Sequence, residues 1–432
     1  MSEITMGSII LVGSFALMLA CGIEIAYSLG LSAVFTCLFM DINLLVVFQS
    51  IFYKMSNYSL LAVPCFMLMG EFMSIGSMSS NIVGLANVLV GWMPGGLAMV
   101  NVVDSMFFGG VSGSSVADVS SLGPIVIKLM KDSGYEEDFA VALTCTSSIQ
   151  GIIIPPSHNL VIYAVTAGGV SVAALYMGGY LAGILLGLCL AIYCFYVAKK
   201  RNYPRAEKFT VKNFLHATWK ALPAIGAMLV VVGSVLFGWA TATEAAAAAA
   251  VYCFIFTFLI ERKGSAKDLY NAFTNTIRTI GSVLILAACA TAFSWVITYL
   301  RIPQMVTNGL LAVTSSKFVM LVIINLILLV MGMFMNMLSI VYIMVPILLP
   351  IVTAFGMHPV QFGIMMILNL GIGLLTPPVG QVLFVGASIS GMSVEKITKA
   401  LLPQMMFMVI ALLLVTFVPQ FTMWLPTVMG YI

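Results

Sequence analysis

The chain contains IIIPPSHNLVIYAVTAGGVSV at residues 152–172 and a second version of it, GLLTPPVGQVLFVGASISGMSV, at residues 373–394. The two versions align at a constant offset of 222 residues, with both prolines and the closing Gly-x-Ser-Val identical. Upstream, GPIVI (123–127) matches LPIVT (349–353) after a four-residue gap. One proline doublet would carry little information, because proline is tolerated in membrane helices. Two doublets, each followed by the same glycine and serine, predict an internal repeat.

The composition indicates that lipid surrounds most of the chain. Hydrophobic residues make up 62% of the 432 residues and charged residues only 8%, and the mean hydropathy is +1.13. Soluble domains carry about 25% charged residues, so this chain has too few to cover a soluble core. Because a membrane helix needs about 20 apolar residues, we expect an all-α polytopic membrane protein with roughly ten to twelve crossings. The small net charge of +3 indicates no nucleic-acid partner.

Both proline doublets lie inside apolar segments that would otherwise form continuous helices. Proline removes a backbone donor and clashes with the carbonyl one turn earlier, so each helix must break just before its doublet. The freed carbonyls cannot remain unpaired in lipid and must meet protein, water or a bound cation. Breaks at corresponding positions of two repeats are the best sequence indication of a transporter binding site. A packing kink is the alternative, but these breaks are duplicated and flanked by Gly151, Gly371 and Gly373.

The first break is preceded by a stretch of small and polar residues, FFGGVSGSSVADVSSLG (107–123), and its counterpart before the second break is MGMFMNMLSIVYIMVP (331–346). We interpret these stretches as the tips of re-entrant hairpins, where Ser and Asn oxygens can meet the broken helix. Close helix packing by small residues is the alternative explanation for the serines. It leaves Asp118 and Asn336 unexplained, because polar groups at membrane depth are functional candidates.

Loop charges predict that the two copies lie upside down relative to each other. Residues 199–212 follow the first copy and carry six Lys and Arg residues against one acid, whereas the matching residues 420–432 carry no Lys or Arg. Conversely, the second copy has Lys396 and Lys399 where the link 168–172 of the first copy is uncharged. By the positive-inside rule we expect 199–212 in the cytoplasm and the C-terminus in the periplasm, as in inverted-repeat transporters.

Four stretches together resemble the large, DctM-like membrane subunit of TRAP (tripartite ATP-independent periplasmic) transporters. The resemblance extends from about residue 60 to the C-terminus and is carried by SGSSVADVSSLG (112–123), GIIIPPS (151–157), TEAAAAAAVY (243–252) and NLGIGLLTPPVGQVLFV (369–385). It implies an elevator mechanism with sodium-coupled uptake of a small organic acid in the bacterial inner membrane. Two or more Na+ sites, but no organic cofactor, are expected. The implied partners are a small four-helix membrane subunit (Q type) and a periplasmic substrate-binding protein (P type).

The resemblance also implies which residues bind cations, because similar proteins use a hairpin tip and carbonyls of the broken helix. On this chain the ligands fall into one set per copy: Ser112, Ser115, Gly151, Ile154 and Pro155, and then Asn336, Gly373, Thr376 and Val379. Neighbouring polar residues are the candidates for substrate binding: Ser114, Asp118, Ser157, His158, Asn159 and Gln381.

Some positions depart from the usual family pattern. The second hairpin commonly has Asp where this chain has Asn336, and Pro where it has Ser339, so the second site keeps an acceptor oxygen but loses a charge. The first doublet is usually followed by apolar residues, whereas here Ser157, His158 and Asn159 follow. This variant resembles sialic-acid-type members, which favours sialic acid among the organic acids.

These features divide the chain into four predicted parts. They are N-terminal scaffold helices (1–58), the first repeat (59–198), a basic loop with linking helices (199–280) and the second repeat (281–432).

Two other functions are compatible with parts of the pattern. A self-sufficient ion-coupled carboxylate carrier or antiporter of related architecture would need no partner. An intramembrane serine protease is a remote alternative, because Gly110-Val111-Ser112-Gly113 fits a GxSG pattern and His158 could serve as base. A protease would have no use for a second, inverted copy of the proline break. We therefore expect a transporter and not an enzyme.

Overall fold

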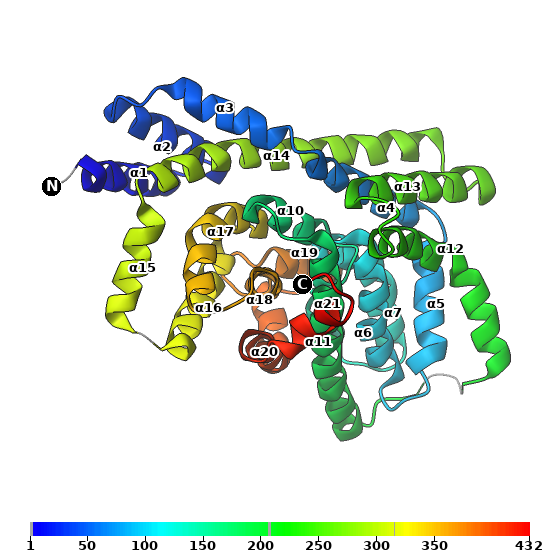
Figure 1. The fold of residues 1–432 in the computed structure, drawn as a ribbon. Helices are drawn as coiled ribbons and strands as arrows, with labels where there is room; N and C mark the ends of the chain where they lie inside the picture. The colour runs from blue at the N-terminus through cyan, green and yellow to red at the C-terminus, as the bar shows by residue number, and fades with distance from the viewer. Residues whose placement is uncertain (1–2, 206–208, 315) are drawn as a thin grey trace.

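The computed structural model describes residues 3–205, 209–314 and 316–432, which fold almost entirely into helices (Figure 1). Within those ranges there is no β-strand. Nine helices are long and apolar enough to cross a membrane, or ten if the bent pair Glu137–Ile153 and His158–Ala167 forms one span. The expected all-α polytopic architecture is therefore confirmed. The number of spans lies at or just below the expected range, because several apolar segments form helices of only 10–17 residues.

Two groups of elements repeat the same succession of hairpin, interrupted helix and long helix. The first group comprises α6 (Gly96–Ser112), α7 (Ser115–Asp132), α8 (Glu137–Ser147), α9 (Gln150–Ile153), α10 (His158–Ala167) and α11 (Val172–Arg201). The second comprises α16 (Lys317–Phe334), α17 (Met337–Ala354), α18 (Pro359–Gly373), α19 (Gln381–Ser390) and α20 (Val394–Phe417), followed by α21 (Gln420–Val428). Figure 1 shows the two groups side by side in the centre of the molecule.

The helices break at the proline doublets, as the sequence predicts. Ile154 precedes Pro155 and has an extended backbone with ψ at 127°, because a residue before proline is disfavoured in the α region. The axis bends by 47° between Ile153 and the restart at His158. Both Pro-Pro peptide bonds are cis. Each break therefore exposes the end of one half-helix and the start of the next to the same space.

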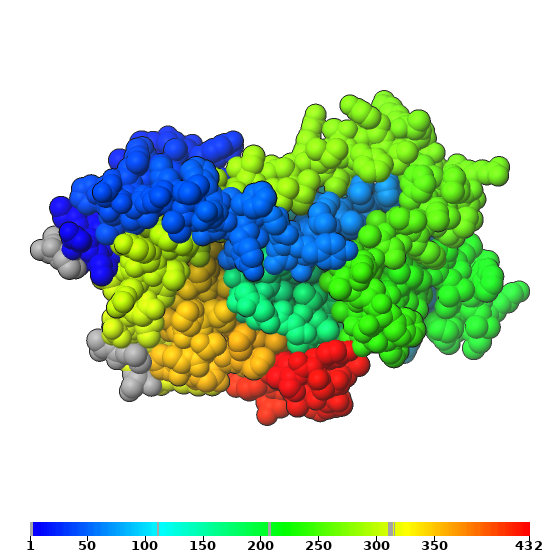
Figure 2. All heavy atoms as spheres, turned by 45° about the horizontal axis from the view of Figure 1, so that its top comes forward, coloured from blue at the N-terminus to red at the C-terminus, as the bar shows by residue number. Residues whose placement is uncertain are grey.

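The remaining helices lie along one side and at both ends of these two groups (Figure 1). They are α1 (Glu3–Ala20), α2 (Ile25–Phe39), α3 (Leu44–Met55), α4 (Ala62–Ile75), α5 (Met78–Val90), α12 (Val211–Leu236), α13 (Ala242–Phe254), α14 (Ala266–Tyr299) and α15 (Ile302–Val313), with short helical turns at Tyr58–Leu61 and Ile255–Ile260. Figure 2 shows the N-terminal segments in blue and the α13–α14 region in green and yellow-green extending across this side.

An aromatic cluster packs α4 against the α13–α14 region. The ring of Phe72 lies 5.7 Å from those of Phe254 and Phe258 and 6.2 Å from that of Phe273, measured between centroids. The contacts are edge-on, which is the favourable arrangement for aromatic pairs. Thr257 adds a hydrogen bond to the Phe72 carbonyl at 3.0 Å. These contacts join α4, α13 and α14 into one wall.

Each of the two central groups contains one close crossing between its hairpin and its interrupted helix. A Cβ on Gly109 of α6 would lie 2.2 Å from the Cα of Gly151 in α9. A Cβ on Gly373 of α18 would lie 2.7 Å from the Cα of Gly332 in α16. Only glycine permits backbones to approach this closely. The sequence repeat therefore reappears as a repeated contact between hairpin and interrupted helix.

A buried hydrogen bond to the side chain of an asparagine also occurs once in each group. Ser147 donates to the Oδ1 of Asn101 at 2.9 Å, and Asn369 donates to the Oδ1 of Asn325 at 2.8 Å. Each contact joins the first helix of a hairpin to the interrupted helix of the same group. The opposite orientation of the two groups in the membrane stays a prediction.

The predicted domain boundaries also stay predictions. The boundary at residue 280 lies inside the continuous helix α14, and the one at residue 58 lies at the first residue of a helical turn. In the basic segment 199–212, Glu207 and Lys208 lie outside the described residues, and Arg201 forms an ion pair with Glu136.

Candidate functional site

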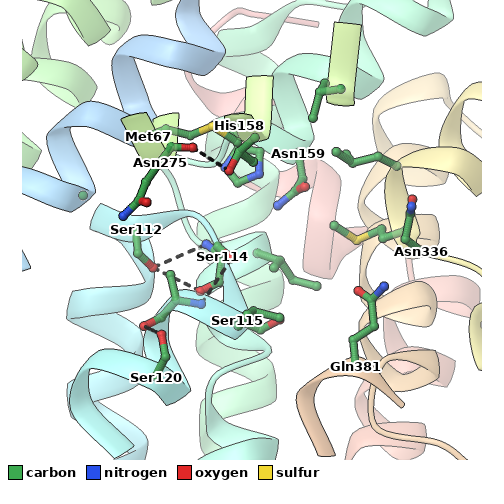
Figure 3. A pocket seen from close by; sticks show the side chains of 18 of the residues that line it. Met67, Ser112, Ser114, Ser115, Ser120, His158, Asn159, Asn275, Asn336 and Gln381 are labelled. Carbon is green, nitrogen blue, oxygen red and sulfur yellow. Dashed lines mark hydrogen bonds between the residues drawn. The ribbon is translucent and has the colours of Figure 1, made fainter. Parts of the chain in front are cut away.

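A cavity of about 640 Å³ lies between the two hairpin tips and the wall formed by α4 and α14. Figure 3 shows Ser112, Ser114 and Ser115 from the first hairpin on one side of this space, and Asn336 and Gln381 on the other. Seven of the fifteen predicted site residues line it: Ser112, Ser114, Ser115, His158, Asn159, Asn336 and Gln381. The tips and the restarted half-helices of both copies thus meet at one cavity, as the repeat suggests.

Four helices begin at the wall of this cavity. Ser115, His158, Met337 and Gln381 line it, and each is the first residue of its helix, in α7, α10, α17 and α19 respectively. The first N–H groups of a helix have no partner within the helix, and they carry about half a positive charge in total. The cavity therefore lies beside the positive ends of four helices.

The first hairpin turns through Gly113, whose φ of 62° is in the left-handed region. A Cβ at this position would lie 2.8 Å from the Nδ1 of His158, so glycine is required both for the turn and for the approach. Ser114 then caps α7, its Oγ accepting from the Ala117 amide at 3.3 Å. Asn159 donates to the Gly113 carbonyl at 2.8 Å and thereby ties the tip to the restarted half-helix.

The second hairpin uses Asn336 in the position that Ser114 has in the first. The Oδ1 of Asn336 accepts from the amide and the hydroxyl of Ser339, both at 2.8 Å, and caps α17. Val379 follows the second doublet, and its amide donates to the Met333 carbonyl at 3.2 Å. Asn336 therefore holds the tip in shape, and a cation at this site would share its Oδ1 with two donors.

The remaining predicted residues do not line the cavity. Gly151 and Gly373 are at the helix crossings, and Ile154, Pro155, Thr376 and Val379 are at the breaks, where the carbonyls are freed. Two hydroxyl groups already pair with such carbonyls, since Ser157 donates to Ile152 at 2.7 Å and Thr376 donates to Ile372 at 2.9 Å. Asp118 is buried and does not line the cavity.

Sequence reasoning missed the wall that faces the tips. On α14 it presents Asn275, Thr279, Ser282 and Leu286, and on α4 it presents Glu71. The spacing of the α14 residues by four, three and four places them on one face of a helix, which is a signal present in the sequence. In the sequence, Glu71 lies near the end of an apolar segment, a position that favours snorkelling or capping over a binding role.

The geometry gives no support to a serine nucleophile. The Oγ of Ser112 donates to the backbone carbonyl of Ser114 at 3.3 Å, and the Nδ1 of His158 has no hydrogen-bond partner. A Ser–His pair requires a hydrogen bond between its members.

The model of the family described as "Tripartite ATP-independent periplasmic transporter, DctM component" matches residues 12–421. The chain belongs to this family. This permease is 37% identical to the C4-dicarboxylate TRAP transporter large permease protein DctM of Vibrio cholerae, over 95% of this chain and 96% of that protein. It is 36% identical to the isethionate TRAP transporter permease protein DctMQ of Oleidesulfovibrio alaskensis, over 96% of this chain and 66% of that protein. It is 35% identical to the sialic acid TRAP transporter large permease protein SiaM of Vibrio cholerae, over 87% and 88% of the two chains.

The fold of the permease also resembles that of a solved transporter. The crystal structure of YdaH from Alcanivorax borkumensis covers 90% of this chain with a TM-score of 0.64, and 89% of the YdaH chain is covered. The sequence identity is 12%, so the likeness concerns the fold alone. Together with the family match, these observations make the permease a multi-pass membrane protein and a TRAP-type secondary transporter, not an enzyme.

Proposed function

We propose that this permease carries out sodium-coupled uptake of a small organic acid by elevator-type alternating access. The observation that carries the proposal is the convergence of four helix N-termini on a cavity that no Lys or Arg of the described residues lines. Half-helix N-termini bind the anionic groups of substrates in membrane transporters, because their free N–H groups face the ligand. These N–H groups would bind the carboxylate of a substrate at membrane depth.

Sodium ions would supply the positive charge that the side chains lack. The C-terminal ends of α9 and α18 carry partial negative charge and freed carbonyls, which suit a hard cation. In the first set, Ser112 and Ser115 would add hydroxyl oxygens to the carbonyls of the break. In the second set, Asn336 and Thr376 would do the same. Cations held there would offset the cost of keeping a carboxylate inside the membrane.

The cavity wall favours a substrate with hydroxyl groups in addition to its carboxylate. The lining includes seven serines, two threonines and three asparagines, so many hydrogen-bond partners face the ligand. This supports a sugar acid such as sialic acid over a C4-dicarboxylate. Relatives named for C4-dicarboxylate, isethionate and sialic acid are nearly equal in identity to this chain, so the choice rests on the cavity.

We expect two partners, a small Q-type membrane subunit with four helices and a periplasmic P-type substrate-binding protein. The relative named DctMQ is longer than this chain, which covers 66% of it and leaves room for a second component in the same protein. We place the permease in the bacterial inner membrane, with residues 199–212 in the cytoplasm and the C-terminus in the periplasm.

Uptake of a labelled organic acid into proteoliposomes tests the proposal. Permease reconstituted with the Q-type subunit should accumulate ligand only when the binding protein is outside and sodium is higher outside than inside. Accumulation that is equally fast without a sodium gradient would contradict coupling. Sodium-driven accumulation by the permease alone would instead identify a self-sufficient carrier.

A further inference from the structure

Helix α4 brings an acid, Glu71, into the wall of the cavity. Glu71 is half-buried and lies between Met67 and Ser74, which also line the cavity. Spacings of four and three residues place all three on one face of the helix. Of the described residues that line the cavity, only Glu71 and His158 have side chains that ionise. The carboxyl group of the lining is therefore on the α4–α14 wall and not at the hairpin tips.

No cation of the described helices neutralises Glu71. Both ion pairs that the described residues form involve the acids that precede or begin α8, so neither Glu71 nor His158 belongs to one. The helices packed against α4 contain two Lys or Arg residues in their described parts, Lys267 and Arg278 of α14, and both are exposed and outside the lining. The imidazole of His158 packs against the first hairpin tip, where a Cβ on Gly113 would lie 2.8 Å from its Nδ1.

Two walls of unlike charge therefore face the same space. Helices α7, α10, α17 and α19 begin at the cavity and present their positive ends to it, whereas α4 presents a carboxyl group. Figure 3 shows Met67 of α4 and Asn275 of α14 across the space from Asn336 and Gln381. The volume of about 640 Å³ is in the range of sites that enclose a whole small ligand. A bound substrate would therefore meet the positive helix ends at one end and Glu71 at the other.

We propose that Glu71 selects substrates by the end that lies away from their carboxylate. It accepts hydrogen bonds from the hydroxyl groups of a sugar acid, and it repels a second carboxylate. This inference rests on the proposed function, in which the helix ends bind the first carboxylate.

The preference follows from the charge of Glu71. Hydrogen bonds to an ionised acceptor are roughly twice as strong as neutral ones, so hydroxyl groups facing Glu71 favour binding. A dicarboxylate would instead bring a like charge against it in a poorly solvated space, and such repulsion is how a site rejects a near relative of its ligand. The permease therefore binds hydroxylated monocarboxylates more tightly than dicarboxylates of the same size.

Protection of a thiol in the cavity wall tests this preference with two matched probes. D-gluconate and D-glucarate have the same carbon chain and hydroxyl groups along it, and they differ at the far end, where gluconate has a hydroxymethyl group and glucarate a second carboxylate. Ser282 is exposed and lines the cavity, so a ligand bound there should shield the thiol introduced by Ser282→Cys.

The full chain with this substitution is treated in liposomes, in sodium chloride, with a membrane-permeant maleimide. Mass spectrometry of the peptide that contains residue 282 gives the rate of modification without interference from the native cysteines. The concentration of gluconate that halves the rate should be at least about tenfold lower than that of glucarate, which equals roughly 1.4 kcal/mol.

Three further variants in the same background separate charge from shape. Glu71→Gln keeps the shape and loses the charge, so gluconate and glucarate should protect at nearly equal concentrations. Glu71→Asp keeps the charge and should retain the preference for gluconate. Glu395→Gln, which changes an exposed acid outside the cavity, should retain it in full. A parental rate of modification without ligand shows that each variant has an intact cavity.

The outcomes distinguish this inference from the proposed function. Equal protection by both acids in the parent, or an unchanged preference in Glu71→Gln, would overturn the role of Glu71 and leave organic-acid transport standing. A preference lost in Glu71→Asp as well would overturn the argument from charge. Protection by neither acid in the parent would contradict the cavity as an organic-acid site and, with it, both proposals. The assay needs neither the binding protein nor a sodium gradient, so it is independent of the uptake measurement.

Discussion

Single side chains at the hairpin tips combine a structural and a binding task. Ser114 and Asn336 cap helices α7 and α17, and both also face the cavity. An N-cap contributes about 1 kcal/mol to helix stability, so a substitution at either residue would mix effects on folding with effects on binding. Substitutions at Ser112 and Thr376 separate binding from folding better, because neither side chain is the N-cap of a helix.

Replacing Ser112 or Thr376 by Ala should raise the half-saturating sodium concentration of uptake. Each change removes one oxygen ligand without adding bulk, and the loss of a hydrogen bond to a charged group costs about 1–3 kcal/mol. This corresponds to roughly five- to 150-fold weaker cation binding. Thr427→Ala, an exposed hydroxyl that bonds within its own helix, is the matched control. Parental sodium dependence in both folded variants would remove these residues from the cation sites.

Helix crossings without side chains hold each hairpin against its interrupted helix. At Gly109 and Gly332 the facing backbone leaves no room for a methyl group, since the partner there is the backbone of Gly151 or Gly373 and not a flexible side chain. The interrupted helix is itself short on one side of the break, as α9 has only four residues. Its position therefore depends on the crossing more than on its own hydrogen bonds.

Gly109→Ala should lower the stability of the permease by about 1–3 kcal/mol, because overpacking forces backbone shifts. Thermal unfolding of the protein in detergent measures the change. Gly84→Ala on α5, where nothing lies within 4 Å, should leave the melting temperature unchanged or raise it, because alanine favours a helix over glycine. Equal melting temperatures for the two variants would contradict the close crossing.

The polar face of α14 forms the wall opposite the hairpin tips, and its residues cap no helix of the tips. Thr279→Phe would place a ring in the cavity, and uptake at subsaturating ligand should fall at least about tenfold, which equals roughly 1.4 kcal/mol. Ile277→Phe on the same helix is the control, because Ile277 is 65% exposed on the outside. Similar uptake by both variants would mean that the substrate does not enter this cavity.

At the scale of the whole molecule, the repeated contacts relate the two halves without defining their direction in the membrane. The crossing at Gly109 and its counterpart at Gly332 exist in either orientation. Direction rests on the loops, where the basic charges follow the first copy and are missing after the second.

Cysteine labelling from the periplasmic side should modify Gly430→Cys but not Arg205→Cys. The background is a chain with Cys21→Ser, because Cys21 is exposed and the other seven native cysteines are buried or partly buried. A membrane-permeant reagent should label both positions and shows that each is accessible. If the impermeant reagent labels both positions, or neither, the inverted arrangement is wrong.

The sequence alone determined the helix breaks, the hairpin tips and the membrane class, because each depends on a few consecutive residues. Proline ends a helix through its own missing donor, and a shortage of charge over a whole chain excludes water as the surrounding solvent. The repeat followed from the spacing of the doublets, and seven of the predicted residues do line the cavity.

Only the tertiary structure decided which residues, distant in the sequence, lie at the same cavity wall. Glu71 and Asn275 are about 200 positions apart in the chain, and packing of α4 against α14 brings them to one wall. Asp118 has the same neighbours in sequence as the cavity residues but is buried and does not line the cavity, because a helix places residues a few positions apart on different faces. Such relations arise from contacts between distant helices, which no local pattern specifies.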